Sequence, residues 1–403
     1  MIIQRPEEVR RLETKKWVLV YGRRKTGKTF LVQNFVKYDS YYFVNRDRTI
    51  ISDEDGVQVP YEVLVDRLRF GAKNGQTIVI DEFHRLGGSF LDVLQSIGAG
   101  GKLILVTSTL FLAKQLLSIR SPIMGLFNEV QIPIISLGES LEALSKEKLD
   151  NKELVETAIM LREPLAVAFY DKNKNAGEIM GDVLLGSAEA VPALFGEILI
   201  EEDKGTTAVF EGIIRAVADG KTTSGEISSS LFSKKLVAKD DPSFVQSYLS
   251  TMVKIGLLRR IKVYEKNKFA YKIPSPLMKL FFYADEKYGI SQRRIKSIEA
   301  NRIITELLPH IVEDNIREHI ADKLGLQEYV FEAKDYDVDG VLVRFNSVQV
   351  VLEVKWGGKV SGEDVRRAEE SLGRINAKRR ILFVQDKKNV HSDMLEIMDA
   401  SDL

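Results

Sequence analysis

The stretch Lys16–Val36, KWVLVYGRRKTGKTFLVQNFV, places a short apolar strand, a glycine-containing loop and an amphipathic helix in direct succession. The loop fits the pattern G-x-x-x-x-G-K-[ST], in which glycines let backbone N–H groups face a phosphate and the helix start attracts negative charge. Lys28 is expected to reach the β- and γ-phosphates of a nucleotide, and the Thr29 hydroxyl is expected to bind Mg²⁺. The stretch therefore predicts a P-loop.

Residues 1–137 alternate apolar, strand-like runs with helical patterns, which predicts a mostly parallel α/β sheet around the P-loop. The expected strands are Trp17–Tyr21, Tyr41–Asn45, Thr77–Ile80, Leu103–Thr107 and Val130–Ile135. The residues assigned to nucleotide binding are Gly22, Arg23, Arg24, Lys25, Thr26, Gly27, Lys28, Thr29 and Phe30.

Two acidic residues follow the third expected strand, in the sequence TIVIDE. They stand at the carboxyl end of that strand, where parallel sheets bind ligands. Asp81 is expected to hold the Mg²⁺ shell, and Glu82 to orient or deprotonate a water molecule. The fourth strand leads into Thr107, Ser108 and Thr109, where a γ-phosphate sensor would stand, although capping of the next helix explains these residues equally well.

Composition narrows the class of protein. The chain has 403 residues, 44% of them hydrophobic, which predicts two to four domains with substantial cores. Lys and Arg total 58, as do Asp and Glu, so any argument for nucleic-acid binding must be local. The absence of cysteine excludes disulfides and thiolate metal sites. With a charged N-terminus and no apolar run of ~20 residues, we expect a cytoplasmic protein without a membrane segment.

Several motifs together resemble the archaeal ATPase family of P-loop NTPases, which lies near the AAA+ and STAND groups. They are QRPEEVRRLE, GRRKTGKT, VIDEFHRL, VTSTLFL and SPIMGLFNEV. The resemblance covers roughly residues 1–200 and implies ATP or ADP binding with Mg²⁺, ATP hydrolysis, and a nucleotide contact by Arg5. It also implies an additional strand between the P-loop strand and the TIVIDE strand, and a helical lid after the sheet.

The chain departs from this family at two places. Relatives usually carry an arginine where this chain has Leu126. If that arginine neutralises transition-state charge, its loss disfavours fast hydrolysis, because such a residue contributes ~10³–10⁵ in rate. The Gly-Gly-x-Pro segment that usually opens the lid is Arg162-Glu163-Pro164 here. Arg162 could contact phosphate in its place, but a solvated charge at a helix end is the simpler interpretation.

The segment from Lys204 to Lys272 is locally basic, with 13 Lys and Arg against 6 Asp and Glu. Its pattern predicts a helix at Ala208–Ala218, a second capped by Thr223 or Ser224, and a third begun by Asp240-Asp241-Pro242. A hairpin turning near Lys266 and Asn267 follows, which completes the order of a winged helix. Such a module either contacts double-stranded DNA through its basic hairpin or docks on protein, and both interpretations stay open.

The C-terminal segment contains KDYDVDGVLVRFNSVQVVLEVKWG, with two strand-like runs joined by a short turn. Glu353 and Lys355 are two apart on one strand and share a face, and Asp339 can converge on them from the neighbouring strand. The pattern resembles the core of PD-(D/E)XK nucleases, in which such carboxylates bind Mg²⁺. In that resemblance Glu318 corresponds to the acid supplied by the preceding helix. A solvated, charged strand face would look the same.

The expected fold is α/β, with four parts: a P-loop NTPase core with a parallel sheet at 1–137, a helical lid at 138–202, a winged helix at 203–285, and a restriction-endonuclease-like domain at 286–403. We expect ATP hydrolysis coupled to domain rearrangement, acting on DNA through the winged helix. The alternatives are a slow-turnover nucleotide switch that docks protein partners, and an ATP-gated DNA nuclease.

Overall fold

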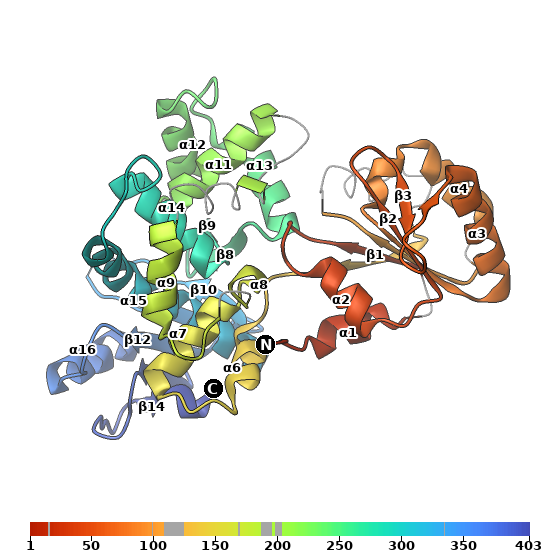
Figure 1. The fold of residues 1–403 in the computed structure, drawn as a ribbon. Helices are drawn as coiled ribbons and strands as arrows, with labels where there is room; N and C mark the ends of the chain where they lie inside the picture. The colour runs from red at the N-terminus through yellow and green to blue at the C-terminus, as the bar shows by residue number, and fades with distance from the viewer. Residues whose placement is uncertain are drawn as a thin grey trace.

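The computed structural model describes residues 1–14, 17–98, 100–108, 125–167, 170–186, 196–197, 204–333 and 335–403. Thr109, assigned to the sensor segment, lies outside the described residues. The described residues form two seven-stranded sheets. Figure 1 shows the first sheet and its helices, in red and orange, beside a second body that contains all later elements.

The first sheet has the strand order β4-β3-β2-β5-β6-β1-β7. Its strands are β1 (Trp17–Tyr21), β2 (Ser40–Val44), β3 (Ile50–Ser52), β4 (Gln58–Val59), β5 (Thr77–Asp81), β6 (Lys102–Val106) and β7 (Phe127–Gln131). The neighbours β2, β5, β6, β1 and β7 are parallel, while β3 and β4 extend one edge in antiparallel pairing. β6 lies between the P-loop strand β1 and β5, which confirms the additional strand expected at that position.

Helices cover both faces of this sheet (Figure 1). They are α1 (Pro6–Leu12), α2 (Lys28–Phe35), α3 (Tyr61–Asn74) and α4 (Ser89–Ile97), with the short 3₁₀ helix η1 at Phe83–Leu86. Alternate residues of β1 enter different cores, as strand geometry requires: Val18 packs with α1 and α2, whereas Leu19 packs with α3 and α4. The P-loop between β1 and α2 is therefore held by two separate cores.

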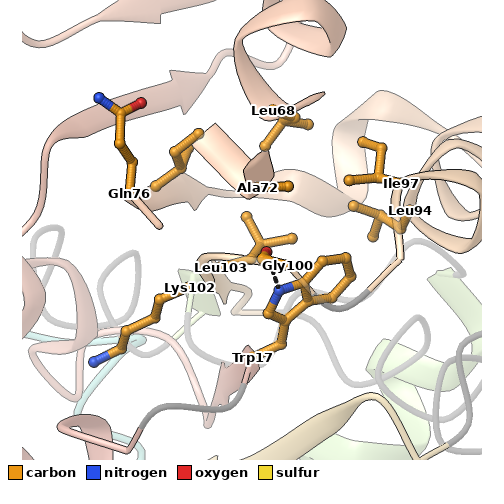
Figure 2. A pocket seen from close by; sticks show the side chains of 10 residues that line it. Trp17, Leu68, Ala72, Gln76, Leu94, Ile97, Gly100, Lys102 and Leu103 are labelled. Atoms are coloured by element: carbon orange, nitrogen blue, oxygen red, sulfur yellow. Dashed lines mark hydrogen bonds between the residues drawn. The ribbon is translucent and has the colours of Figure 1, made fainter. Parts of the chain in front are cut away.

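Trp17 closes the end of this sheet that lies away from the P-loop. Figure 2 shows its ring among side chains of α3, α4 and β6, with Nε1 donating a hydrogen bond of 3.3 Å to Gly100 O. The cavity beside it has a volume of only about 10 Å³. That volume is about one water molecule, so this end of the sheet is packed shut.

The second body begins with a group of short helices. They are α6 (Leu137–Leu144), α7 (Asn151–Leu161), α8 (Pro164–Val167) and α9 (Ala176–Leu185). α6 begins at Leu137 because Ser136 and Glu139 form a reciprocal capping box at its N-terminus. α7 is capped by Asp150, whose side chain accepts a hydrogen bond from Glu153 N.

The basic segment forms the elements expected of it. They are α11 (Lys204–Ala218), α12 (Ser224–Ser233), α13 (Pro242–Ile255), β8 (Arg259–Val263) and β9 (Phe269–Lys272). Thr223 caps α12 and Asp241 caps α13, each through its side-chain oxygen. The helices α14 (Pro276–Tyr288) and α15 (Ser297–Leu324) follow.

The last elements complete the second sheet, whose strand order is β14-β13-β12-β11-β10-β8-β9. They are β10 (Gln327–Val330), β11 (Gly340–Arg344), β12 (Ser347–Lys355), α16 (Gly362–Gly373), β13 (Arg379–Val384), β14 (Glu396–Met398) and the 3₁₀ helix η3 (Ala400–Asp402). The β8–β9 hairpin joins this sheet because β8 pairs in parallel with β10. One hydrophobic core contains buried residues of α7, α13, α15 and β12, so the second body is continuous inside.

Candidate nucleotide-binding site

The loop between β1 and α2 needs glycine at two positions. Gly22 has φ 150°, and a Cβ there would lie 2.5 Å from Ile132 O, closer than real contacts allow. Gly27 has φ 83° in the left-handed region and caps the N-terminus of α2. These two positions allow the loop to curl at the carboxyl end of β1, with the first N–H groups of α2 free of helical partners.

Lys28 lies at the centre of this loop, with only 6% of its surface exposed. Its Nζ donates hydrogen bonds to Gly22 O at 3.0 Å and to Arg23 O at 2.7 Å. Burial lowers the pKa of Lys28 to about 8, and the nearby Glu82 and Asp81 carboxylates oppose that shift. With a pKa of about 8, Lys28 is still mostly protonated at pH 7, and a phosphate beside it would favour the ammonium form further.

Asp81, at the end of β5, is fully buried beside α2. Its Oδ2 accepts hydrogen bonds from Thr29 Oγ1 at 2.6 Å and from Tyr41 OH at 2.8 Å. Burial and the adjacent Asp81 charge raise the pKa of Tyr41 far above its ordinary value, so its hydroxyl remains a donor. Thr29 and Asp81 therefore bring two hard oxygen atoms together, which fits the ligand preference of Mg²⁺.

Glu82 lies beside the segment assigned to phosphate sensing. Ser108 Oγ is 2.9 Å from Glu82 Oε1 and 3.1 Å from Oε2, and Arg85 NH2 is 3.3 Å from Oε2. His84 Nε2 is 3.5 Å from the same carboxylate, while burial lowers the pKa of His84 to about 4. The imidazole is therefore neutral at pH 7, and Arg85 supplies the cationic partner of Glu82.

A cavity of about 640 Å³ opens beside the loop, between α2, the N-terminal segment and the short helix α8. Loop residues Lys25, Thr26 and Gly27 form one wall. Apolar side chains line much of the remainder: Ile2, Ile3, Phe30, Ile135, Leu165 and Tyr170. Its volume and largely apolar lining are typical of a small-molecule site.

Arg5 and Thr26 hold the wall of this cavity. Arg5 is 6% exposed, and its NH1 donates to Thr26 O at 3.2 Å and to Pro133 O at 3.1 Å. Thr26 is 1% exposed, and its Oγ1 donates to Arg23 O at 3.2 Å. Arg5 also lines the cavity. A contact of Arg5 with a ligand would therefore be made while its guanidinium stays hydrogen-bonded to Thr26 O of the loop.

The remaining basic residues of the loop differ in surroundings. Arg23 is buried and forms an ion pair of 2.6 Å with Glu163. Arg24 is half-buried, and its charge contributes to the lowered pKa of Lys28. Lys25 is exposed and pairs with Glu197 at 3.1 Å. Lys28 thus lies inside the loop and Lys25 faces solvent, whereas Arg23 points into the protein.

The expectation for Arg162 was wrong. This residue was interpreted as a solvated helix-end charge, but it is 3% exposed. Its NH1 is 2.9 Å from Glu318 Oε2, and its Nε donates to Ile135 O at 3.1 Å. Sequence reasoning missed this burial, together with the roles of Tyr41 and Glu163. The acid-base pair Arg162-Glu163 in an otherwise apolar helix end was the available signal.

Leu126 lies at the far end of the first sheet from the P-loop. It precedes β7, whose first residue Phe127 pairs with Trp17 at the start of β1. Leu126 packs against the core on the α3–α4 face. An arginine at position 126 could therefore not reach a γ-phosphate at the P-loop of its own chain. It could approach only a γ-phosphate bound to a neighbouring subunit.

The C-terminal residues Asp339, Glu353 and Lys355 come together at the ends of β11 and β12. Asp339 Oδ2 accepts a hydrogen bond from Val354 N at 2.7 Å, and Lys355 Nζ is 2.5 Å from Glu353 Oε1. Burial, followed by the Glu353 charge, raises the pKa of Asp339 well above its ordinary value. Burial likewise raises the pKa of Glu353, which is 4% exposed and whose Oε2 has no hydrogen-bond partner among the described residues.

Glu318 does not belong to this carboxylate pair. It binds Arg162 and Arg259, the latter at 2.8 Å. The acid of α15 whose charge acts on both Asp339 and Glu353 is Glu313. The described residues contain no group of three or more His, Cys, Asp or Glu side chains arranged to hold a metal ion. Asp339 and Glu353 thus offer two carboxylates without a third ligand.

The hairpin lysines expected to face DNA are paired within the protein. Lys266 and Lys268 lie 3.2 Å and 2.6 Å from Glu332 Oε2. At the end of α13, Ile255 O accepts a hydrogen bond from Arg23 N at 3.0 Å. The basic segment therefore touches both the second sheet and the P-loop.

No described helix combines the length and the apolar character needed to cross a membrane.

Residues 14–141 match a family model described as an AAA domain, while a comparison with curated proteins finds no match. Among solved structures, the chain is similar to the Aeropyrum pernix ORC1 protein in complex with DNA, with 17% identity, coverage of 72% of this chain and 94% of that chain, and a TM-score of 0.29. It is also similar to the Aeropyrum pernix ORC2 protein in ADPNP-ADP complexes, with 12% identity, coverage of 78% and 95%, and a TM-score of 0.37. The similarity to Pyrobaculum aerophilum CDC6P has 14% identity, coverage of 73% and 96%, and a TM-score of 0.27. The family match alone shows that the first sheet and its P-loop are similar to AAA domains.

Proposed function

We propose that this protein binds ATP at the P-loop and hydrolyses it slowly, using the bound nucleotide to change the relation between its two bodies. One observation carries the proposal: the loop lysine, the Thr29–Asp81 pair and the Glu82–Ser108 pair meet at the carboxyl edge of one parallel sheet. That edge is where open α/β sheets bind nucleotides. The neighbouring cavity is large enough for a nucleoside.

Each residue has a distinct task in this proposal. Lys28 and the N–H groups of the loop bind the β- and γ-phosphates, and Thr29 with Asp81 would hold Mg²⁺, which supplies charge neutralisation when bound. Glu82 orients the attacking water and accepts its proton, and Ser108 fixes the Glu82 carboxylate. The apolar cavity wall accommodates the base.

Slow turnover follows from the position of Leu126. The chain has Leu126 where relatives usually carry an arginine. Leu126 precedes β7, at the end of the sheet that lies away from the chain's own P-loop. An arginine that stabilises transferring phosphate contributes ~10³–10⁵ in rate, so its absence favours long-lived nucleotide binding. This supports a nucleotide switch over a fast motor.

Lys28→Ala tests the proposal. The variant should weaken ATP binding at least about tenfold, or roughly 1.4 kcal/mol, because it removes the buried ammonium that faces the phosphates. Lys73→Ala is the matched control, since Lys73 is an exposed lysine of α3. Calorimetry with ATP and Mg²⁺ measures both variants. Equal ATP affinity in Lys28→Ala and wild type would contradict the proposed function.

A second candidate activity concerns the Asp339–Glu353 pair. Two neighbouring carboxylates with raised pKa values and one unpartnered buried oxygen form a set of hard donors that a divalent cation would stabilise. We propose that this pair binds Mg²⁺ or Mn²⁺, with metal-dependent DNA cleavage as the corresponding activity. The contact of Lys355 with Glu353 supports the opposite version, in which the lysine replaces the metal.

Thermal unfolding of Asp339→Asn separates these versions. Without metal, raised carboxyl pKa values destabilise the fold increasingly as pH rises above their unfolded values, so Asn should stabilise the protein at pH 8 and have little effect near pH 4. A gain of about 1 kcal/mol shifts the Tm of a chain of 403 residues by roughly 1–2 °C. Mn²⁺ should raise the Tm of wild type but leave the variant unchanged. If Mn²⁺ affects neither protein and DNA stays intact, the lysine-filled version holds.

A further inference from the structure

Arg23 is the residue of the P-loop that points away from the nucleotide cavity. Its side chain and that of Glu163 are each 1% exposed, and Arg23 NH2 lies 2.6 Å from Glu163 Oε2. Glu163 belongs to the segment between α7 and α8, in the second body. A buried ion pair therefore joins the loop proposed to bind phosphate to the other half of the protein.

Glu163 also connects to α14. Ser275 Oγ donates to Glu163 Oε2 at 2.5 Å and accepts from Met278 N at 3.2 Å, so the N-cap of α14 depends on the same carboxylate. The backbone adds a parallel link, because Arg23 N donates to Ile255 O at the end of α13. The conformation of Arg23 is thus tied to two helices of the second body.

The ion pair leaves hydrogen-bonding capacity unused. Arg23 Nε and Glu163 Oε1 are buried and have no hydrogen-bond partner among the described residues. Unpartnered buried polar atoms cost free energy, and native proteins keep few of them. Two oxygens of one phosphate could satisfy the guanidinium in a bidentate contact, whereas here only one Glu163 oxygen bonds to it.

Arg162 anchors the other side of the same segment. While Glu163 faces the P-loop, Arg162 binds Glu318 and Asn315 of α15. Glu318 binds Arg259 of β8 in turn. Movement of Glu163 is therefore resisted by the second body, and displacement of its carboxylate changes the contact between the bodies.

We propose that Arg23 is a nucleotide-controlled latch: its guanidinium is held by Glu163 in the resting protein and exchanges to a phosphate of bound nucleotide, which releases the P-loop from the α14 N-cap. The latch rests on the proposed nucleotide binding and describes its regulation. Because the carboxylate and the phosphate compete for one cation, Glu163 lowers nucleotide affinity in the resting protein. By linkage, nucleotide weakens the contact between the bodies by the same factor.

Glu163→Gln is the decisive variant, because the amide is isosteric and can still accept a hydrogen bond from Ser275. ATP affinity measured by calorimetry should rise at least about fivefold, the lower limit of typical coupling between sites. In an Arg23→Gln background the same change should have no effect, since the competing cation is absent. A purely structural ion pair would instead leave ATP affinity unchanged and only lower Tm.

Glu197→Gln is the matched control. It removes a carboxylate from another P-loop cation, Lys25, but that pair is exposed, with side chains 41% and 48% accessible. Exposed pairs contribute little, so ATP affinity should change less than about twofold. An equal rise in both variants would show a general effect of negative charge and would overturn the latch.

A second readout follows the two bodies directly. The chain has no cysteine, so Lys73→Cys and Lys388→Cys place one dye on each body at exposed positions. ATP should change energy transfer in the wild-type background, whereas Arg23→Gln should bind ATP without this change. A full change in Arg23→Gln would refute the latch even if Glu163→Gln fails to fold. Absence of ATP binding in the wild-type background would instead reject the proposed function itself.

Discussion

Glu82 adopts a backbone conformation that residues other than glycine occupy only uncommonly. Its φ is 54°, in the left-handed region, and the residue follows Asp81 directly at the end of β5. Such strain persists only where the surrounding structure imposes it, and it is common at functional sites. Here it turns the Glu82 carboxylate towards Ser108 while Asp81 remains directed at Thr29. The two adjacent carboxylates thus bind different groups, Thr29 for Asp81 and Ser108 for Glu82, which indicates different roles.

Glu82→Gln tests that division of tasks. ATP affinity should stay within about twofold of wild type, because the carboxylate acts on water rather than on nucleotide, whereas phosphate release should fall ~10²-fold or more. Asp81→Asn provides the comparison, since loss of the Thr29 partner should weaken Mg²⁺-dependent ATP binding itself. Unchanged phosphate release in Glu82→Gln would remove this residue from the catalytic role.

Individual residues were predictable where a motif fixes both residue type and spacing. Lys28, Thr29 and Asp81 lie together because strand order and loop length leave few other arrangements. The burial of Arg162 was not predictable in this way. Its charge is compensated by Glu318, which is 156 residues away in the sequence, and no local pattern encodes a partner at that separation.

Helix periodicity explains the error at Glu318. Glu313 and Glu318 are five residues apart on α15, so at 3.6 residues per turn their side chains project about 140° apart. The charge of Glu313 acts on Asp339 and Glu353 at the ends of β11 and β12, whereas Glu318 binds Arg162 and Arg259. The sequence motif predicts an acid on the preceding helix. Which acid of α15 faces the strands depends on the rotation of the helix about its axis, and packing determines that rotation.

Strands were located more reliably than their boundaries. β1 has the expected limits, Trp17–Tyr21, whereas the strand expected at Val130–Ile135 is β7, Phe127–Gln131. Parallel pairing with β1 fixes the register of β7, so its start is set by a neighbour that the local apolar pattern does not reveal. This shift also places Leu126 away from the P-loop.

The whole chain carries no formal net charge, so its electrostatic behaviour depends on where charges pair. The basic segment expected to contact DNA has its hairpin lysines bound to Glu332, outside that segment. Pairing reduces the positive potential that attracts phosphate, and the join between β8 and β10 fixes the hairpin in the second sheet. DNA contact through Lys266 and Lys268 would therefore compete with their pairing to Glu332, and protein docking is the second interpretation of this segment.

Glu332→Gln distinguishes these two interpretations. If the hairpin binds double-stranded DNA, loss of Glu332 frees Lys266 and Lys268, and affinity at low salt should rise about three- to tenfold, with a steeper decrease as salt increases. Lys266→Glu with Lys268→Glu should weaken binding to all sequences equally, as expected for phosphate contacts. Glu265→Gln is the control, because this acid lies on the same hairpin turn and makes no ion pair within the described residues. Fluorescence anisotropy over a salt series measures each variant, and a wild-type protein that binds no DNA at low salt would leave protein docking as the role of this segment.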